Sequence, residues 1–308
     1  MSDTPSKLDR SLQLIRSSFQ IIGRNRKLLL FPIISFAFTI VIVLFFAAPV
    51  VLLPTGHAWS DPEHWKAVAS RFGSPDPSGG PRHVVYSDTA YASVAAIYLV
   101  SMVCATFFNV AFYSEILKAL RGNAVSIRSG LSFACSRIGS ILMWSLFAGV
   151  VGLVIRGLER RFGLVGRIIL RLVGTVWSVA CVFVVPVIVA SGSANPVELL
   201  RNSASTLKKT WGESLIGYVG ITFASWIIIF GSVVILGGGF AVSVLIGHPM
   251  LMAFIGAAWF VCAFALGYLL AVANHIFRCA LYIYASEGTV TAPFTQDMIS
   301  GAWKIKKA

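Results

Sequence analysis

Long apolar runs constrain this chain more than any other feature of its sequence. A helix needs about 20 mostly apolar residues to cross a bilayer with its backbone hydrogen bonds satisfied. Six runs meet or nearly meet this length, at residues 28–53, 91–116, 138–155, 172–190, 215–236 and 249–273. Charged residues make up 12% of the chain, about half of what an ordinary soluble domain carries. The sequence therefore predicts an all-α, polytopic transmembrane helix bundle of about six spans, and it excludes a soluble or secreted enzyme.

The first apolar run follows basic residues, as the apolar core of a signal peptide does. At residues 28–53 it is far longer than the roughly 7–15 residues of a cleavable signal, and no A-x-A-like site follows it. We expect the run to remain in place as the first span.

Lys and Arg are unevenly distributed between the runs. They are frequent before the first run, after the second and fourth runs, and in the tail, whereas the loop at residues 54–90 holds three of them against four acidic residues. By the positive-inside rule, both termini are cytoplasmic in a cell (inner) membrane and this loop is extracytoplasmic. The predicted parts are an amphipathic N-terminal helix at 1–27, a bundle at 28–285 and a basic tail at 286–308. The net charge of +13 then reflects topology and anionic phospholipid headgroups, not nucleic acid.

One basic segment departs from this distribution, because a six-span count places it outside. It lies between the third and fourth runs. On a single helix, four of its arginines share one face, and aliphatic side chains share the opposite face. These arginines are Arg156, Arg160, Arg167 and Arg171. The pattern predicts a basic amphipathic helix in the membrane interface, in contact with lipid headgroups.

The segments that follow the even-numbered runs resemble one another. Residues 122–134 align without gaps on residues 192–204, and each begins with a glycine and leads into the next run. The sixth run also exits through a glycine, Gly288. The start of the chain has an amphipathic pattern too, with Leu12, Ile15, Phe19 and other apolar residues on one face and Ser17 among those opposite. We therefore expect three repeated units, each an interfacial amphipathic helix followed by a two-span hairpin.

Three segments of the chain resemble a known family. They are W-S-V-A-x-x-F-V-V-P-V-I-V at residues 177–189, L-L-R-N-S-A-S-T-L-K-K-T-W-G-E at 199–213, and A-L-Y-I-Y-A at 280–285. These look like hallmarks of an uncharacterised prokaryotic family of six-helix integral membrane proteins. The resemblance implies the architecture, but no activity, catalytic residue or ligand. An acidic residue often follows the Val-rich stretch in this family, where this chain has Ala190-Ser191-Gly192.

Polar residues at membrane depth form the candidate site. Asn109 lies in the second run, and Asn274, His275 and Arg278 follow the sixth. When the sequence before Gly122 is aligned with the sequence before Gly288, Asn109 occupies the same position as His275. Because polar groups in spans are costly and usually face the bundle interior, this cluster is a candidate binding or transport site. The alternative is a structural role, as hydrogen bonds between helices or as snorkelling of Arg278 to the interface.

Other features carry weaker signals. His57, Asp61, Glu63, His64 and His83 include metal-ligand types, but the surrounding Gly and Pro residues predict a solvated loop. Gly237-Gly238-Gly239 lies in an apolar stretch and favours close helix packing over phosphate binding. The five cysteines match neither a disulfide framework nor a zinc motif. We expect no catalytic residue, metal or cofactor.

Three classes of function remain. The sequence favours a non-catalytic membrane protein that engages lipid headgroups, a membrane protein partner or a second copy of itself. The alternative is a permease or channel for a small solute, which would use the polar cluster of the second and sixth spans. A lipid-modifying enzyme ranks third, because no pair of carboxylates or histidines converges in the apolar runs.

Overall fold

The computed structural model describes residues 7–71, 73–75, 84–86, 88–209, 230–240, 242, 246, 249–296 and 298. Within these residues the fold is helical apart from one small antiparallel hairpin, β1 (Gly73–Pro75) with β2 (Val84–Tyr86), in which Ser74 pairs with Val85. The helices up to residue 191 are α1 (Lys7–Arg24), η1 (Arg26–Leu29), α2 (Leu30–Leu52), α3 (Pro62–Ser70), α4 (Asp88–Leu120), α5 (Ile127–Ser136), α6 (Ile138–Arg161), α7 (Leu164–Ala180) and α8 (Val184–Ser191). They are followed by α9 (Pro196–Lys209), a short apolar helix Phe230–Phe240, and α11 (Pro249–Glu287).

Five helical stretches of the described chain are long and apolar enough to cross a membrane. They are Arg26–Ala48, Ala90–Leu120, Ile138–Glu159, Ile168–Ser191 and Ala253–Glu287. The chain is therefore an all-α, multi-pass membrane protein. The fifth predicted run, 215–236, lies mostly outside the described residues.

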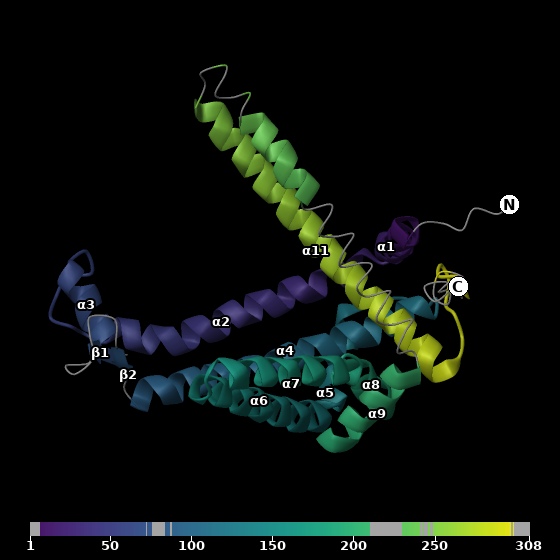
Figure 1. Ribbon diagram of the computed structural model, residues 1–308, viewed down its shortest axis with the longest axis horizontal. Coiled ribbons are helices and arrows are strands. Elements are labelled where there is room, and N and C mark those ends of the chain that lie inside the picture. The colour runs from purple at the N-terminus through teal and green to yellow at the C-terminus, as the bar shows by residue number, and fades with distance from the viewer. Residues whose placement is uncertain are drawn as a thin grey trace.

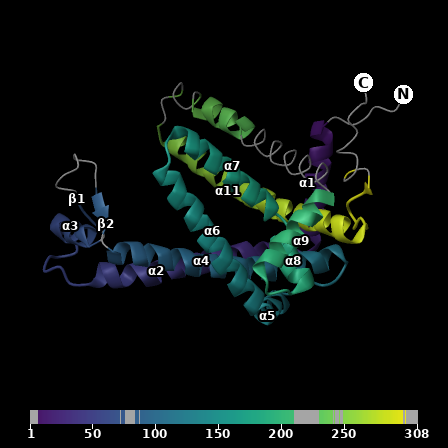
Figure 2. The same cartoon turned by 60° about the horizontal axis from the view of Figure 1, so that its bottom comes forward.

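The loop that joins α2 to α4 lies at one end of α2, and α1 lies near the other end (Figure 1). α3 and the β1–β2 hairpin lie together at one end of α2 and α4, and α1 packs near the other end against α11. α2 and α4 pack along each other in both views (Figure 2). Stacking of Phe31 on Phe112, with ring centroids 5.7 Å apart, joins these two helices.

The buried core occupies only one part of the long helices. Side chains with no exposure, such as Val110, Ile116, Ile188 and Ile276, come from α4, α8 and α11. Further along α2 and α11 the apolar side chains are exposed, as Phe45 is at 71%. Because lipid tails are as apolar as these side chains, exposed apolar helix faces fit a bilayer.

The last helix is longer than the apolar run within it. The predicted run ends near residue 273, whereas α11 continues to Glu287. The next residue, Gly288, has a left-handed φ of 69°. The extension buries Ile276, Phe277 and Ile283 in the core, so packing sustains the helix where hydropathy falls. Asn274, His275 and Arg278 consequently lie within α11, not after it.

The fourth predicted span is broken. α7 ends at Ala180 and α8 begins at Val184. Pro186 has no N–H to donate to the carbonyl four residues earlier, so the helical hydrogen bonding is interrupted there. Ser203 of α9 occupies the break: its hydroxyl donates to the Ala180 carbonyl at 2.6 Å and accepts from the Phe183 N–H at 3.0 Å. This buried serine satisfies backbone groups that lipid could not.

The basic segment is not one helix, so the prediction of a single amphipathic helix is wrong, whereas contact of its arginines with lipid headgroups stays a prediction. α6 runs to Arg161, a turn occupies Phe162 and Gly163, and α7 starts at Leu164. The helices of the third and fourth apolar runs continue to the tip, and the hairpin packs through Trp144 and Trp177, whose parallel rings lie 6.2 Å apart. A tight hairpin between two packed spans leaves no room for a separate interfacial helix.

Two further sequence features can be compared with the structure. The buried face of α1 is rotated from the predicted one: Ser17 is 5% exposed and Leu12 is 46% exposed, because α1 packs against α11 and not only at a lipid surface. The glycines that begin the segments after the even-numbered runs, here called the elbow glycines, adopt the left-handed conformation that glycine favours at helix ends. Gly122, Gly192 and Gly288 have φ values of 79°, 64° and 69°.

Candidate functional site

A cavity of about 280 Å³ lies between α2, α4 and α11, and both Asn109 and His275 line it. The two residues that the alignment of Gly122 on Gly288 places at equivalent positions thus line the same cavity. The remaining lining residues are Phe31, Pro32, Ser35, Phe36, Thr39, Phe108 and Phe112. Aromatic walls with a few polar groups are typical of small-molecule sites.

Helix spacing explains how α4 supplies one side of the cavity. Phe108 and Phe112 are four residues apart, and so are Asn109 and Tyr113, so each pair shares a face of α4. α11 faces them across the cavity. Its Tyr268 hydroxyl donates to the Leu29 carbonyl, which ties α11 to the start of α2.

A chain of polar contacts links α4 to α11 behind the cavity. The Tyr113 hydroxyl lies 2.8 Å from His275 Nδ1, and an Arg278 guanidinium nitrogen donates to the same hydroxyl oxygen at 3.4 Å. Tyr113 is 2% exposed. The imidazole is also held edge-on against the Phe112 ring, with centroids 5.5 Å apart. His275 is thus fixed in orientation from two sides.

The other two predicted site residues do not line this cavity. Arg278 is not among the lining residues, but it donates to Tyr113, which contacts the lining residue His275. Asn274 is separate from the polar chain, and its buried Oδ1 has no hydrogen-bond partner among the described residues. Sequence reasoning missed Tyr113, Ser35 and Thr39. The signal for Tyr113 was its position one helical turn after Asn109.

The pair Glu115 and Lys118 holds the turn between α4 and α5. Glu115 has no exposure; its Oε1 lies 2.6 Å from Lys118 Nζ, and its Oε2 accepts from the Ser126 N–H at 2.7 Å. Lys118 also donates to Ser129 Oγ at 2.5 Å. The contacts are those of a buried structural anchor, with every charge partnered.

A second cavity, of about 480 Å³, lies where the ends of α4, α8 and α11 meet. An exposed ion pair between Arg121 and Glu287, 2.5 Å apart, joins two of these ends. Lys118 also lines the cavity. Lys118 and Arg121 lie at the C-terminus of α4, where they offset the negative end of its helix dipole, so we interpret this cavity as a structural junction.

Basic residues gather at the tip of the α6–α7 hairpin. Arg156 and Arg171 are exposed, and the Arg156 guanidinium lies 5.9 Å from the centre of the Tyr98 ring. The structure does not describe the side chains of Arg160 and Arg167. Exposed apolar side chains flank the tip, among them Val154, Phe162, Ile168 and Leu172.

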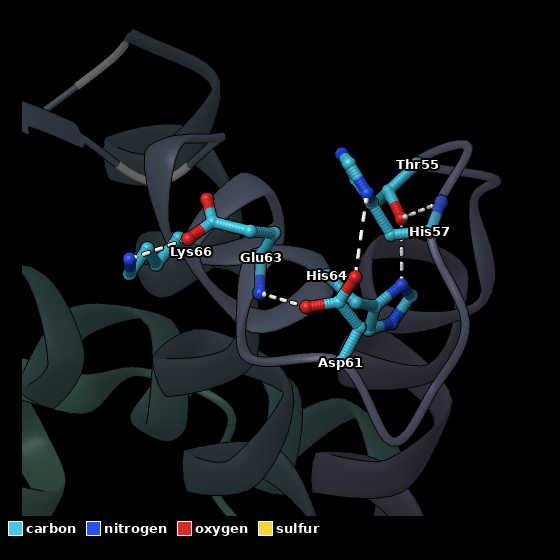
Figure 3. Close-up of polar contacts among 6 residues, drawn as sticks. All are labelled: Thr55, His57, Asp61, Glu63, His64 and Lys66. Atoms are coloured by element: carbon cyan, nitrogen blue, oxygen red, sulfur yellow. Dashed lines mark hydrogen bonds and ion pairs between the residues drawn. The ribbon is translucent and has the colours of Figure 1, made fainter.

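The polar residues of the loop between α2 and α4 serve local structure (Figure 3). Asp61 caps α3 by accepting from the Glu63 N–H at 3.0 Å, and it lies 3.7 Å from His57. His64 bonds to Thr55 at 2.6 Å and stacks on Trp59. No group of three metal-ligating side chains occurs among the residues that the structure describes. His83 lies outside them.

The fold and the cavity define a multi-pass helical membrane protein with a polar site between its spans. The chain belongs to a family of unknown function, DUF6159, whose model matches residues 89–292. No curated protein and no solved structure matches it. Membership agrees with the resemblance to an uncharacterised family, whereas the six-helix architecture that the resemblance implies stays a prediction.

Proposed function

We propose that this protein is a permease or channel for a small solute, which passes through or docks in the cavity between α2, α4 and α11. The observation that carries this proposal is that Asn109 and His275 line one cavity. Polar groups at membrane depth are costly unless they serve a function or another polar group. Here they face a space large enough for a small molecule.

The proposed architecture has six spans in three repeated hairpin units, with the fifth span in the region before Phe240. Three elbow glycines with left-handed φ values support the repeat, as does the shared cavity of Asn109 and His275. The proposed orientation has both termini in the cytoplasm of a cell membrane. Cysteines placed at Ser74 and Ser300 should then be labelled from opposite sides. Labelling from one side would overturn the orientation.

The second candidate is a non-catalytic protein that engages anionic lipid headgroups through the α6–α7 tip. Its support is the exposed Arg156 and Arg171 beside exposed apolar side chains, a combination that suits the membrane interface. The sequence favours this function over the permease. We reverse that order because the cavity required by a permease is present, whereas the single basic helix is not. A lipid-modifying enzyme remains third.

Swelling of proteoliposomes tests the proposal that the protein is a permease or channel. Vesicles containing the protein are transferred into isotonic glycerol, urea or acetate, and solute entry is followed by light scattering. We expect faster swelling than in protein-free vesicles with at least one solute, and its loss in Asn109→Leu and His275→Leu. Thr175→Leu is the matched control, because this exposed α7 residue bonds only to its own helix at Arg171 and lies outside the cavity. Swelling no faster than in protein-free vesicles for every solute would overturn the proposal.

A further inference from the structure

We propose that the cavity between α2, α4 and α11 recognises a hydrogen-bond-accepting oxygen, carried as a carbonyl or carboxylate on a small apolar body. This inference rests on the proposed solute site and names its ligand class. It follows from the direction of the hydrogen bonds behind the cavity, the composition of its walls and the charges that line it.

The hydrogen-bond direction starts at Arg278. A guanidinium only donates, so the Tyr113 oxygen is the acceptor of the contact at 3.4 Å. We assign the proton of the Tyr113 hydroxyl to the contact with His275 Nδ1, 2.8 Å away. A neutral imidazole that accepts at Nδ1 carries its proton on Nε2. His275 therefore offers the cavity an N–H donor.

The neighbouring polar groups suit the same ligand. Asn109 brings an amide that donates through its nitrogen. Thr39 uses its own proton within α2, donating to the Ser35 carbonyl at 2.9 Å. Two donors from facing helices, His275 on α11 and Asn109 on α4, can thus converge on one ligand oxygen, which has two lone pairs to accept them.

The walls determine the rest of the ligand. Phe31, Phe36, Phe108 and Phe112 line the cavity, so the part of the ligand beyond its oxygen is apolar or aromatic. No Asp or Glu is among the described lining residues. A ligand ammonium would therefore find no carboxylate to balance its charge, which disfavours cations.

The tautomer of His275 is tested by ¹⁵N NMR of histidine-labelled protein in lipid nanodiscs, with His275→Gln used to assign its signals. We expect the Nε2–H form in the native protein, and loss of this preference in Tyr113→Phe, which removes the hydroxyl that fixes it. A predominant Nδ1–H form, or a Tyr113→Phe spectrum identical to the native one, would overturn the inference. Neither result depends on transport, so the permease proposal would stand.

Binding of three probes of similar shape tests the ligand class: benzoate, benzamide and benzylammonium, titrated into the protein in nanodiscs. Benzoate and benzamide carry the acceptor oxygen, with and without charge, and benzylammonium only donates. We expect either acceptor to bind better than benzylammonium. His275→Leu should weaken that binding about tenfold, and His275→Gln, which retains a terminal N–H, should preserve most of it. Preference for benzylammonium, no binding of either acceptor, or equal affinity in the native and His275→Leu proteins would overturn the inference.

Discussion

Tyr113 and His275 lie 162 residues apart in sequence and meet at 2.8 Å between the tyrosine hydroxyl and Nδ1. The contact joins α4 and α11, the two longest of the described helices. It places His275 against the cavity that Asn109 lines from the other side. Since Tyr113 is almost fully buried, the same contact supports the fold and orients the candidate site.

Gly130 is the point of closest approach between α5 and its neighbours. A Cβ there would lie 2.9 Å from the Ala111 carbonyl oxygen, Glu115 Cγ and Phe31 Cζ. Gly130→Ala should therefore lower the free energy of unfolding by about 1–3 kcal/mol, measured by denaturant titration in detergent. Gly139→Ala is the control, since nothing lies within 4 Å of its Cβ position. Equal stability of the two variants would contradict this packing.

The buried Glu115 should be costly to alter. Lys118→Met leaves the buried carboxylate with the Ser126 N–H, at 2.7 Å, as its remaining hydrogen-bond donor. Because Lys118 itself is 36% exposed, we expect a loss of about 1–3 kcal/mol of stability, as for a buried group that loses one partner. The exposed pair of Glu63 and Lys66 provides the comparison, because Lys66→Met should cost under about 1 kcal/mol. Thermal unfolding of both variants checks the difference. A Lys118→Met protein as stable as Lys66→Met would contradict the anchoring role of Glu115.

Ser203 should protect the break between α7 and α8. Ser203→Ala leaves the Phe183 N–H and the Ala180 carbonyl without this partner, and an unsatisfied buried group costs about 1–3 kcal/mol. Hydrogen exchange at residues 181–184 should become faster. Ser205→Ala is the control, because the exposed Ser205 hydroxyl donates only within its own helix, to the Asn202 carbonyl at 3.0 Å. Exchange at residues 181–184 should be unchanged in this variant. Unaltered exchange in Ser203→Ala would show that the break needs no side-chain bond.

The arginines of the hairpin tip should retain anionic lipid. Replacing Arg156, Arg160 and Arg167 with Glu should reduce the anionic phospholipid that copurifies, by about 1 kcal/mol of binding free energy for each positive charge removed. The same three positions changed to Lys keep the charge and provide the control. Lipid mass spectrometry measures the outcome. Unchanged lipid content in the Glu variant would assign these arginines to protein contacts.

The sequence predicts the broad fold because its signals are local. Apolar runs of span length and the glycines at positions 122, 192 and 288 identify helices and elbows, and the spacing from two of these glycines leads to Asn109 and His275. Features that depend on tertiary contacts are not predictable in this way. The extension of α11 is sustained by core packing, the buried face of α1 is set by α11, and the role of Tyr113 requires a partner 162 residues away.

Solvent access to the cavity tests the central claim most directly. In a background whose five cysteines are replaced by alanine, single cysteines are placed at Asn109, at His275 and at Val94, a residue of α4 that is 64% exposed on the apolar surface. A small water-soluble thiol reagent is added to the protein in nanodiscs, and full labelling after denaturation verifies each variant. We predict rapid labelling at positions 109 and 275 and slow labelling at 94, because thiolates form in water and not in lipid. Labelling at both cavity positions as slow as at position 94 would contradict a solute site there.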